Sequence, residues 1–214
     1  MAPAPAAAAI LAGGRARRFG GTIKSTLPIG GARIIDRQLA ALGQVADPIF
    51  VVANDPAPFV SLGLTIVPDL LPGCGALGGI YSAIVRSPRE RTLVVAGDLP
   101  GLSVPLLKRL VQPAEAGIVV PRGARGYEPL CAVYARACAE PIRRRLEAGD
   151  LKASVMPAGV HVEVIGPEDL AAYDPDGLLF INVNTPHEYE RARALIEGMP
   201  QRPGDRITGT HSAS

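Results

Sequence analysis

The chain has 214 residues, of which 48% are apolar and 20% charged, a composition typical of a globular protein with one sizeable core. Its formal net charge of +2 and its lack of tryptophan argue against a general polyanion binder and against stacking platforms for single-stranded nucleic acid. The three cysteines form no CxxC pair, which favours a reducing cytoplasmic location. We expect Cys131 and Cys138 to be small buried hydrophobes.

Short apolar runs alternate with helical patterns along the chain. The predicted strands are residues 6–10, 48–53, 64–68, 92–98, 117–120, 129–134, 161–165 and 178–183. Helices are predicted over 32–43, 77–85, 103–112 and 135–148, with a last helix that carries Tyr189, Ala192 and Ile196. This alternation predicts a three-layer αβα domain with a Rossmann-like, mostly parallel sheet covered on both faces.

The two ends of the chain carry little regular pattern. The opening MAPAPAAAAI has no basic residue before its apolar part, so we expect neither a signal peptide nor a membrane anchor. We expect a single domain over residues 1–197 and a flexible C-terminal tail over 198–214, where turn formers and small polar residues replace periodicity.

The stretch LAGGRARRFGGTIK, residues 11–24, follows the first predicted strand and joins glycines to cations without any carboxylate. Ligands of such sheets bind beyond the carboxyl ends of the strands, and glycine amides with basic side chains suit a phosphate. The stretch is not a Walker loop, because Lys24 follows Ile23, nor a dinucleotide fingerprint, because RARRFGG is too long and too basic for that turn. A structureless basic loop stays open as the alternative.

The pattern LAGGxxxRFGGxxK resembles the signature of the molybdenum cofactor guanylyltransferases, and further family motifs follow in order. These are Asn54, Pro68-Asp69, the glycine run 73–79, Gly97-Asp98-Leu99-Pro100, Pro129-Leu130 with Tyr134, and Asn182-Val183-Asn184-Thr185-Pro186. The matches span about residues 6 to 197. Three positions depart from the family: Phe19 replaces the usual methionine, Ile23 an acidic residue and Ala76 a common proline. An acidic residue at position 23 would orient the lysine.

The resemblance implies a fold of the nucleotide-diphospho-sugar transferase type and transfer of GMP from GTP to the phosphate of molybdopterin, with release of pyrophosphate. It also implies Mg²⁺ as cofactor, and other proteins of molybdenum cofactor biosynthesis, or acceptor proteins, as partners. The implied catalytic residues are Arg18, Lys24 and Asp98, with Asp98 as the metal ligand. The implied nucleotide-binding residues are Leu11, Ala12, Gly13, Lys24, Asn54, Asp69 and Asp98, and the implied acceptor-binding residues are Asn182 and Asn184.

Several of these residues also have ordinary structural interpretations. Asp98 ends a central strand, where a carboxylate reaches a ligand, and Mg²⁺ bound to a triphosphate takes only one or two protein carboxylates. Its alternative, a helix cap, is weaker because Ser103 is better placed to cap. Asn54 and Asp69 are alternatively turn residues. We interpret Thr185 as an N-cap only.

Two glycine-rich segments likewise keep two interpretations. The run 75–79 offers its backbone to a base edge or packs a helix tightly against the sheet. Arg122 and Arg125 in the turn RGARGYE form a solvated hairpin tip or reach the acceptor phosphate.

Three functions therefore stay open. The first is an active guanylyltransferase; the second is a related nucleotidyltransferase that uses CTP or another phosphorylated acceptor. The third is a GTP-binding relative without transfer activity. Release of pyrophosphate that requires GTP, magnesium and molybdopterin together distinguishes the enzyme from the binding protein.

Overall fold

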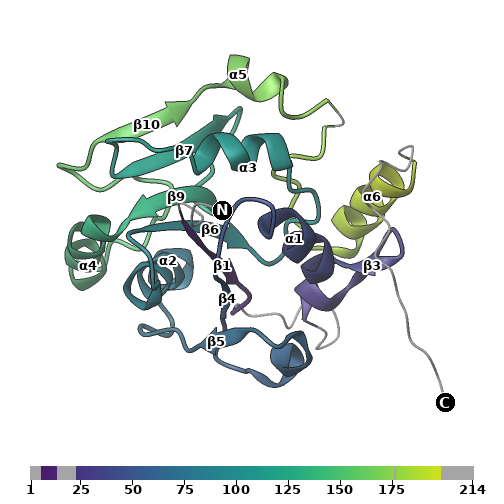
Figure 1. Ribbon diagram of the computed structural model, residues 1–214, viewed down its shortest axis with the longest axis horizontal. Coiled ribbons are helices and arrows are strands. Elements are labelled where there is room, and N and C mark those ends of the chain that lie inside the picture. The colour runs from purple at the N-terminus through teal and green to yellow at the C-terminus, as the bar shows by residue number, and fades with distance from the viewer. Residues whose placement is uncertain (1–5, 14–22, 176, 199–214) are drawn as a thin grey trace.

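A computed structural model describes residues 6–13, 23–175 and 177–198. Its central feature is a sheet with the strand order β10-β7-β9-β6-β1-β4-β5, to which β8 adds by pairing with β7 (Figure 1). The strands are β1 (Ala7–Leu11), β4 (Ile49–Val52), β5 (Thr65–Val67), β6 (Arg91–Ala96), β7 (Ile118–Gly123), β8 (Gly126–Tyr127), β9 (Cys131–Ala135) and β10 (Val162–Ile165). Arg15, Arg17, Arg18 and Phe19, and the predicted tail from residue 199 onward, lie outside the described residues.

The sheet is mostly parallel, as predicted. The pairs β1–β4, β1–β6, β4–β5 and β7–β10 are parallel, whereas β9 runs antiparallel to both of its neighbours, β6 and β7. Consequently β1, β4, β5, β6, β7 and β10 all end at the same edge of the sheet, and β9 begins there. The loops that carry the predicted site residues follow these strand ends.

The helices are α1 (Ile34–Leu42), α2 (Gly75–Arg86), α3 (Val104–Leu110), α4 (Ala139–Glu147), α5 (Pro167–Ala171) and α6 (Pro186–Glu197). Short 3₁₀ turns cover Lys24–Thr26, Ala57–Leu62 and Arg136–Cys138, and a hairpin joins β2 (Pro28–Ile29) to β3 (Ala32–Arg33). The predicted helix over 135–148 is thus a 3₁₀ turn followed by α4, with Pro141 in its first turn, where proline is tolerated.

Two separate apolar cores cover the two faces of the sheet and confirm the three-layer prediction. Alternate residues of β1 face opposite sides, so Ala8 and Ile10 pack with α1 and α3, whereas Ala7 and Ala9 pack with α2 and α4. The alanine-rich β1 has weak strand propensity, but its residues from Ala7 to Ile10 are fully buried between β4 and β6. Burial on both faces therefore outweighs propensity here.

A third, smaller cluster attaches α6 to the β2–β3 hairpin at the side of the molecule (Figure 1). Its buried members are Ile29, Ile34, Val183, Ala192 and Ile196. Val183 also donates its N–H to Asp98 O over 3.0 Å, so the segment just before α6 is held beyond the end of β6.

The prediction of a strand over 178–183 is wrong. This segment forms no ladder with any strand of the described residues. Phe180 has a φ of 62°, which interrupts an extended conformation, and the Leu178 and Leu179 N–H groups donate to Asp174 Oδ1 in a turn. Leu178, Ile181 and Val183 pack with α6 and the β2–β3 hairpin, whereas Leu179 and Phe180 pack against the larger core. Apolar content alone does not separate such a buried segment from a strand.

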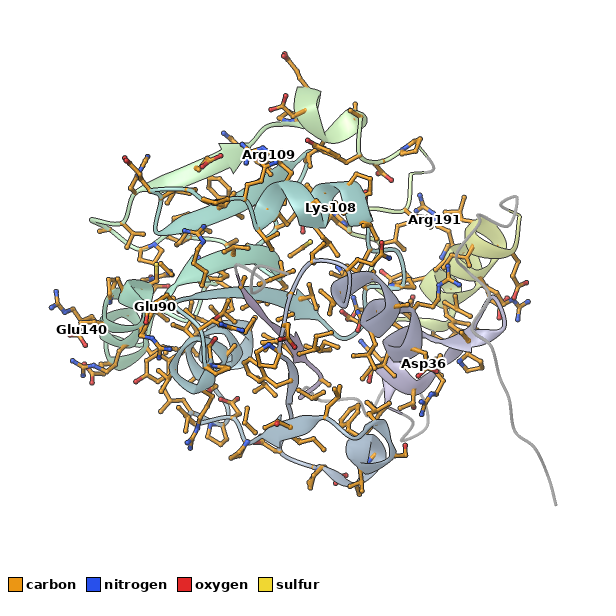
Figure 2. The ribbon with its side chains drawn as sticks, in the orientation of Figure 1. Asp36, Glu90, Lys108, Arg109, Glu140 and Arg191 are labelled. Atoms are coloured by element: carbon orange, nitrogen blue, oxygen red, sulfur yellow. The ribbon has the colours of Figure 1, made fainter. Side chains whose placement is uncertain are left out.

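Outside the site, an ion pair attaches α3 to the edge strand β10. Arg109 on α3 pairs with Glu163 on β10, whereas Glu140 on α4 points away from the body of the molecule (Figure 2).

Cys131 and Cys138 are buried, as predicted, with exposures of 2% and 1%. Burial raises the pKa of Cys131 to about 12. In the described part of the chain, no helix has the length and apolar character needed to cross a membrane.

Candidate active site

Three predicted site residues meet beyond the carboxyl end of β6. The Lys24 ammonium donates a hydrogen bond to Asn184 Oδ1 over 2.6 Å, and it lies 3.7 Å from Asp98 Oδ2. The side chains of Lys24 and Asp98 are 17% and 22% exposed, so the pair lies at the surface without being fully solvated. The lysine that ends the glycine-rich stretch and the carboxylate that follows the central strand therefore share one site.

Gly97 allows Asp98 to come this close to the end of β1. The Gly97 N–H donates to Leu11 O over 3.0 Å. A Cβ atom at position 97 would lie 3.1 Å from Leu11 O and 3.3 Å from Ala12 Cα, tighter than most real Cβ contacts. The predicted Gly-Asp pair thus has a packing reason: glycine permits the approach, and the next residue carries the functional group.

A buried glutamine from α1 holds the turn that contains Asp98. Gln38 is completely buried, and its Nε2 donates to Ala96 O over 2.8 Å and to Leu99 O over 2.9 Å. These two carbonyls flank Asp98 in the chain. Sequence reasoning missed Gln38, although a polar residue between Ile35 and Leu42 on the buried face of an amphipathic helix is a usable signal.

Burial and a neighbouring cation shift the pKa of Asp98 in opposite directions. Burial raises the pKa of Asp98 above its usual range, and the nearby Lys24 ammonium partly offsets this effect. A carboxylate that is partly desolvated and faces one cation is suited to a second cationic partner. The site therefore favours a ligand that brings additional positive charge to Asp98 and negative charge to Lys24.

Asn184 is positioned by the start of α6. Glu188 Oε2 accepts hydrogen bonds from the Asn184 N–H over 2.9 Å and from the Thr185 N–H over 2.8 Å. Thr185 Oγ1 in turn accepts from the Glu188 N–H over 3.2 Å, which confirms the predicted N-cap and completes a capping box. Sequence reasoning did not single out Glu188, although the T-x-x-E spacing marks it.

A second pair of predicted residues meets beyond β4 and β5. Asn54 Oδ1 accepts a hydrogen bond from the Asp69 N–H over 3.0 Å. Asp69 Oδ1 accepts from Ser82 Oγ over 2.7 Å and from the Leu71 N–H over 3.1 Å. Asp69 therefore shapes the turn, as its structural interpretation predicts, and Asn54 beside it remains exposed.

The first strand ends between these two groups. The Ala12 N–H donates to Val52 O over 3.0 Å and is already used by the sheet. Gly13 is exposed, and its backbone makes no hydrogen bond to the residues that the structure describes. Of the three predicted backbone positions, Gly13 is the one that presents a donor to a ligand.

Ile23, at the position where the resemblance implies an acidic residue, is an apolar packing residue next to Lys24. Its side chain packs against the larger apolar core, and its carbonyl accepts from the Thr26 N–H and hydroxyl in the 3₁₀ turn. Lys24 is oriented by Asn184 and Asp98 instead.

The remaining predicted positions are glycines of α2, arginines of the β7–β8 hairpin, and Asn182. Gly78 and Gly79 are buried, and a Cβ at Gly79 would lie 3.0 Å from Leu11 Cδ1, so these two glycines serve helix packing. Arg122 lies over the Tyr127 ring, and Arg125 Nη2 donates to Phe180 O over 3.2 Å, so the hairpin tip is partly tied down. Asn182 is partly exposed in the segment that leads to Asn184.

The donor set around Asp98 fits a divalent ion that is shared with a ligand. Within residues 6–13, 23–175 and 177–198, no group of three or more His, Cys, Asp or Glu side chains could hold a metal ion without help. Mg²⁺ bound through one carboxylate and through phosphate oxygens needs no such group. Asp98 is a carboxylate of this kind and lies 3.7 Å from the Lys24 ammonium.

Polar residues lie at the ends of β1, β4, β5 and β6, and a lysine and a carboxylate are paired at one edge, an arrangement suited to a nucleotide bound at the carboxyl edge of an α/β sheet. The family model of the MobA-like NTP transferase domain matches residues 8–163. The chain belongs to this family.

Known relatives agree over almost the whole chain. The molybdenum cofactor guanylyltransferase of Desulfosudis oleivorans is 36% identical over 190 residues, which cover 88% of this chain and 94% of that protein. A probable molybdenum cofactor guanylyltransferase of Pelotomaculum thermopropionicum is 34% identical over 189 residues, covering 88% and 92%. The solved structure of molybdopterin-guanine dinucleotide biosynthesis protein A from Archaeoglobus fulgidus has a TM-score of 0.75 at 26% identity and covers 90% of this chain and 100% of that one. The predicted family and fold are confirmed.

Proposed function

We propose that the protein transfers GMP from GTP to the phosphate of molybdopterin, forming molybdopterin guanine dinucleotide and pyrophosphate. The observation that carries this proposal is the meeting of Lys24, Asp98 and Asn184 at the carboxyl edge of the sheet. The relatives named as guanylyltransferases favour GTP as the donor.

In this proposal the nucleotide lies along the edge of the sheet. Asn54 and Asp69 lie beyond β4 and β5, toward the sugar or base, and Gly13 offers its amide beyond β1. Asp98 lies beyond β6, on the other side of β1. Adjacent strands are about 5 Å apart, and β5 and β6 are three spacings apart, so these residues span roughly 15 Å, a distance suited to a nucleoside triphosphate.

The reaction needs positioning and charge rather than a covalent intermediate. A phosphate oxygen of molybdopterin attacks the α-phosphorus of GTP in line, and the bond to the pyrophosphate oxygen breaks. Lys24 donates to the phosphoryl oxygens, and Asn184 holds the lysine before the substrates arrive. Arg18 is the proposed second cation, and Asn182 and Asn184 are proposed to orient the acceptor phosphate.

Asp98 would hold the divalent ion, which we propose is Mg²⁺. When bound, this ion neutralises charge on the triphosphate and on the departing pyrophosphate. A ring of protein ligands is not required, because the phosphates provide most of the oxygen donors.

The test is to replace Asp98 by asparagine and to measure pyrophosphate release from GTP, Mg²⁺ and molybdopterin. We expect Asp98→Asn to lower kcat by about a hundredfold or more, since the variant keeps the shape of the side chain but loses the charge that holds the ion. Glu115→Gln is the matched control, because Glu115 is an exposed carboxylate before β7, at the opposite edge of the sheet. Wild-type activity in Asp98→Asn would refute the metal assignment.

The same assay separates the other candidate functions. Release with CTP in place of GTP identifies a cytidylyltransferase, and release with another phosphate monoester identifies a different acceptor. Tight GTP binding without any pyrophosphate release would refute the enzyme and support a binding protein.

The cellular compartment is also a proposal. Cys74, Cys131 and Cys138 are all free thiols. Free thiols are typical of a reducing compartment, and we propose the cytoplasm.

A further inference from the structure

A cavity of about 320 Å³ opens at the same edge of the sheet, on the far side of Asp98 from Asn54. It lies between the β7–β8 hairpin, α5 and the segment that leads to α6. Its lining includes Gly123, Arg125, Glu128, Leu170, Leu179 and Phe180. Because β9 alone separates β7 from β6, the cavity is roughly 10 Å, or two strand spacings, from Asp98.

Glu128 brings a carboxylate into this cavity without a bonded partner. Among the described residues, the Glu128 side chain accepts no hydrogen bond and forms no ion pair. The Arg125 guanidinium donates a hydrogen bond from Nη2 to Phe180 O. Burial raises the pKa of Glu128, and the charge of Arg125 partly opposes this shift. A half-buried carboxyl group with unused acceptor capacity favours a ligand that donates hydrogen bonds.

The surface beside this carboxylate is apolar and open. A Cβ atom at Gly123 would lie 3.5 Å from Glu128 Oε1 and 3.9 Å from Phe180 Cδ2, so the glycine leaves space next to both groups. Leu170 and Leu179 add apolar lining. A flat heterocycle with donor groups along one edge matches a carboxylate at one side and an aromatic ring with leucines around it.

We infer that this cavity binds the 2-amino-4-oxopyrimidine end of the acceptor's pterin, with Glu128 accepting from the ring N–H and the 2-amino group. The inference rests on the proposed function, which makes a pterin the acceptor. That ring edge presents two adjacent N–H donors, which pair with the two oxygens of one carboxylate.

Guanine carries the same donor edge, and the position of the cavity decides between the two ligands. The nucleotide side of the edge lies at β1, β4 and β5, whereas the cavity lies beyond β7, with Asp98 between them. A pterin in the cavity leaves its phosphate arm directed toward the Lys24–Asp98 pair. GTP bound through Asn54 and Gly13 would keep its guanine away from Glu128.

The test compares Glu128→Gln with the control Glu115→Gln in steady-state assays and in direct binding of 6-hydroxymethylpterin. The glutamine places an NH₂ group against the ligand's own donors. We expect the KM for molybdopterin to rise about ten- to a hundredfold, the KM for GTP to stay within about twofold, and pterin binding to weaken to a similar degree. Gly123→Ala makes only ordinary contacts in the free protein but takes up space beside Glu128 and Phe180, and it should also raise the KM for molybdopterin.

An unchanged KM for molybdopterin in Glu128→Gln would overturn the inference, and so would a raised KM for GTP, which would assign the cavity to guanine. If the wild-type protein transfers no GMP to molybdopterin, the proposed function fails. The direct binding of 6-hydroxymethylpterin then still tests the assignment of the cavity. Pterin bound by the wild type and lost in Glu128→Gln supports the cavity assignment, whereas no pterin binding by the wild type refutes it.

Discussion

At the scale of single residues, the site depends on side chains that hold other side chains. Lys24 is oriented by Asn184, and Asn184 is itself held in place by the hydrogen bond that its N–H donates to Glu188. Asp98 is oriented by a turn whose carbonyls are bonded to Gln38. Preorganisation of this kind lowers the cost of aligning charges when the substrates bind.

Gln38 should therefore influence both stability and turnover. Gln38→Met leaves Ala96 O and Leu99 O without their donor, and we expect it to lower the free energy of unfolding by about 1–3 kcal/mol. It should also lower kcat more than it changes the KM for GTP, because the variant disturbs the position of Asp98 only. Urea unfolding and steady-state kinetics check both effects.

Gln44→Met is the matched control for this variant. Gln44 is exposed, just beyond the end of α1, and its amide bonds only to Ala40 O. We expect its stability and kinetics to match the wild type. Equal values for the Gln38 and Gln44 variants would show that Gln38 does not position the turn.

At the scale of elements, helix starts are fixed by hydrogen bonds between residues close together in the chain, and one of these starts also positions a site residue. Ser103 caps α3 by accepting from the Leu106 N–H, and Thr185 and Glu188 cap α6. At α1, the Arg33 guanidinium bonds to the Asp36 carboxylate (labelled in Figure 2) and holds the pKa of that carboxyl below its usual range. Of these three starts, α6 adjoins a predicted site residue directly.

The start of α6 should make stability depend on pH. Burial alone would raise the pKa of Glu188, but hydrogen bonds from Asn184 and Thr185 outweigh it and hold this pKa below its usual range. A depressed pKa contributes stability above the unfolded value of about 4.5, and this contribution disappears as the pH falls through the folded value. We expect Glu188→Gln to cost about 0.5–1 kcal/mol at pH 7.

Denaturant unfolding of the wild type and Glu188→Gln from pH 7 down to pH 3 measures this difference. The two curves should begin to converge as the pH falls below about 4.5 and should meet once the pH is below the depressed pKa of the folded Glu188 carboxyl group. A constant difference over the whole range would mean that the charge of Glu188 contributes nothing to the cap.

At the scale of the whole molecule, the sheet brings distant segments to one edge. The described part of the chain has no metal-binding cluster of its own, and its two cores lie on opposite faces of the sheet. The fold should therefore be stable without metal, while catalysis should require it. Stability and activity respond to different parts of the molecule.

Chelation by EDTA should accordingly stop GMP transfer and leave the Tm of the ligand-free protein unchanged within about 1 °C. GTP with Mg²⁺ at about a hundred times its Kd should raise the Tm by about 5–10 °C, and GTP with EDTA by much less. Differential scanning fluorimetry measures both shifts. A large fall in Tm with EDTA alone would reveal a structural metal ion and contradict this expectation.

Much of the fold was predictable from the sequence, because the relevant interactions act over a few residues. Short apolar runs and helical patterns located most strands and helices, and glycine with cations after the first strand indicated a phosphate site. Asp98 at a strand end and Thr185 at a helix start follow from the same local rules. The family motifs add the expected chemistry.

Only the tertiary structure decided how residues far apart in the chain meet. Lys24 and Asn184 bond across 160 positions, and no local pattern predicts that pair. The apolar run 178–183 was predicted as a strand and is instead a buried segment, because burial can come from α6 as well as from a sheet. The acceptors of Gln38 and the open surroundings of Glu128 were decided in the same way, by strand order and packing, which depend on the whole chain at once.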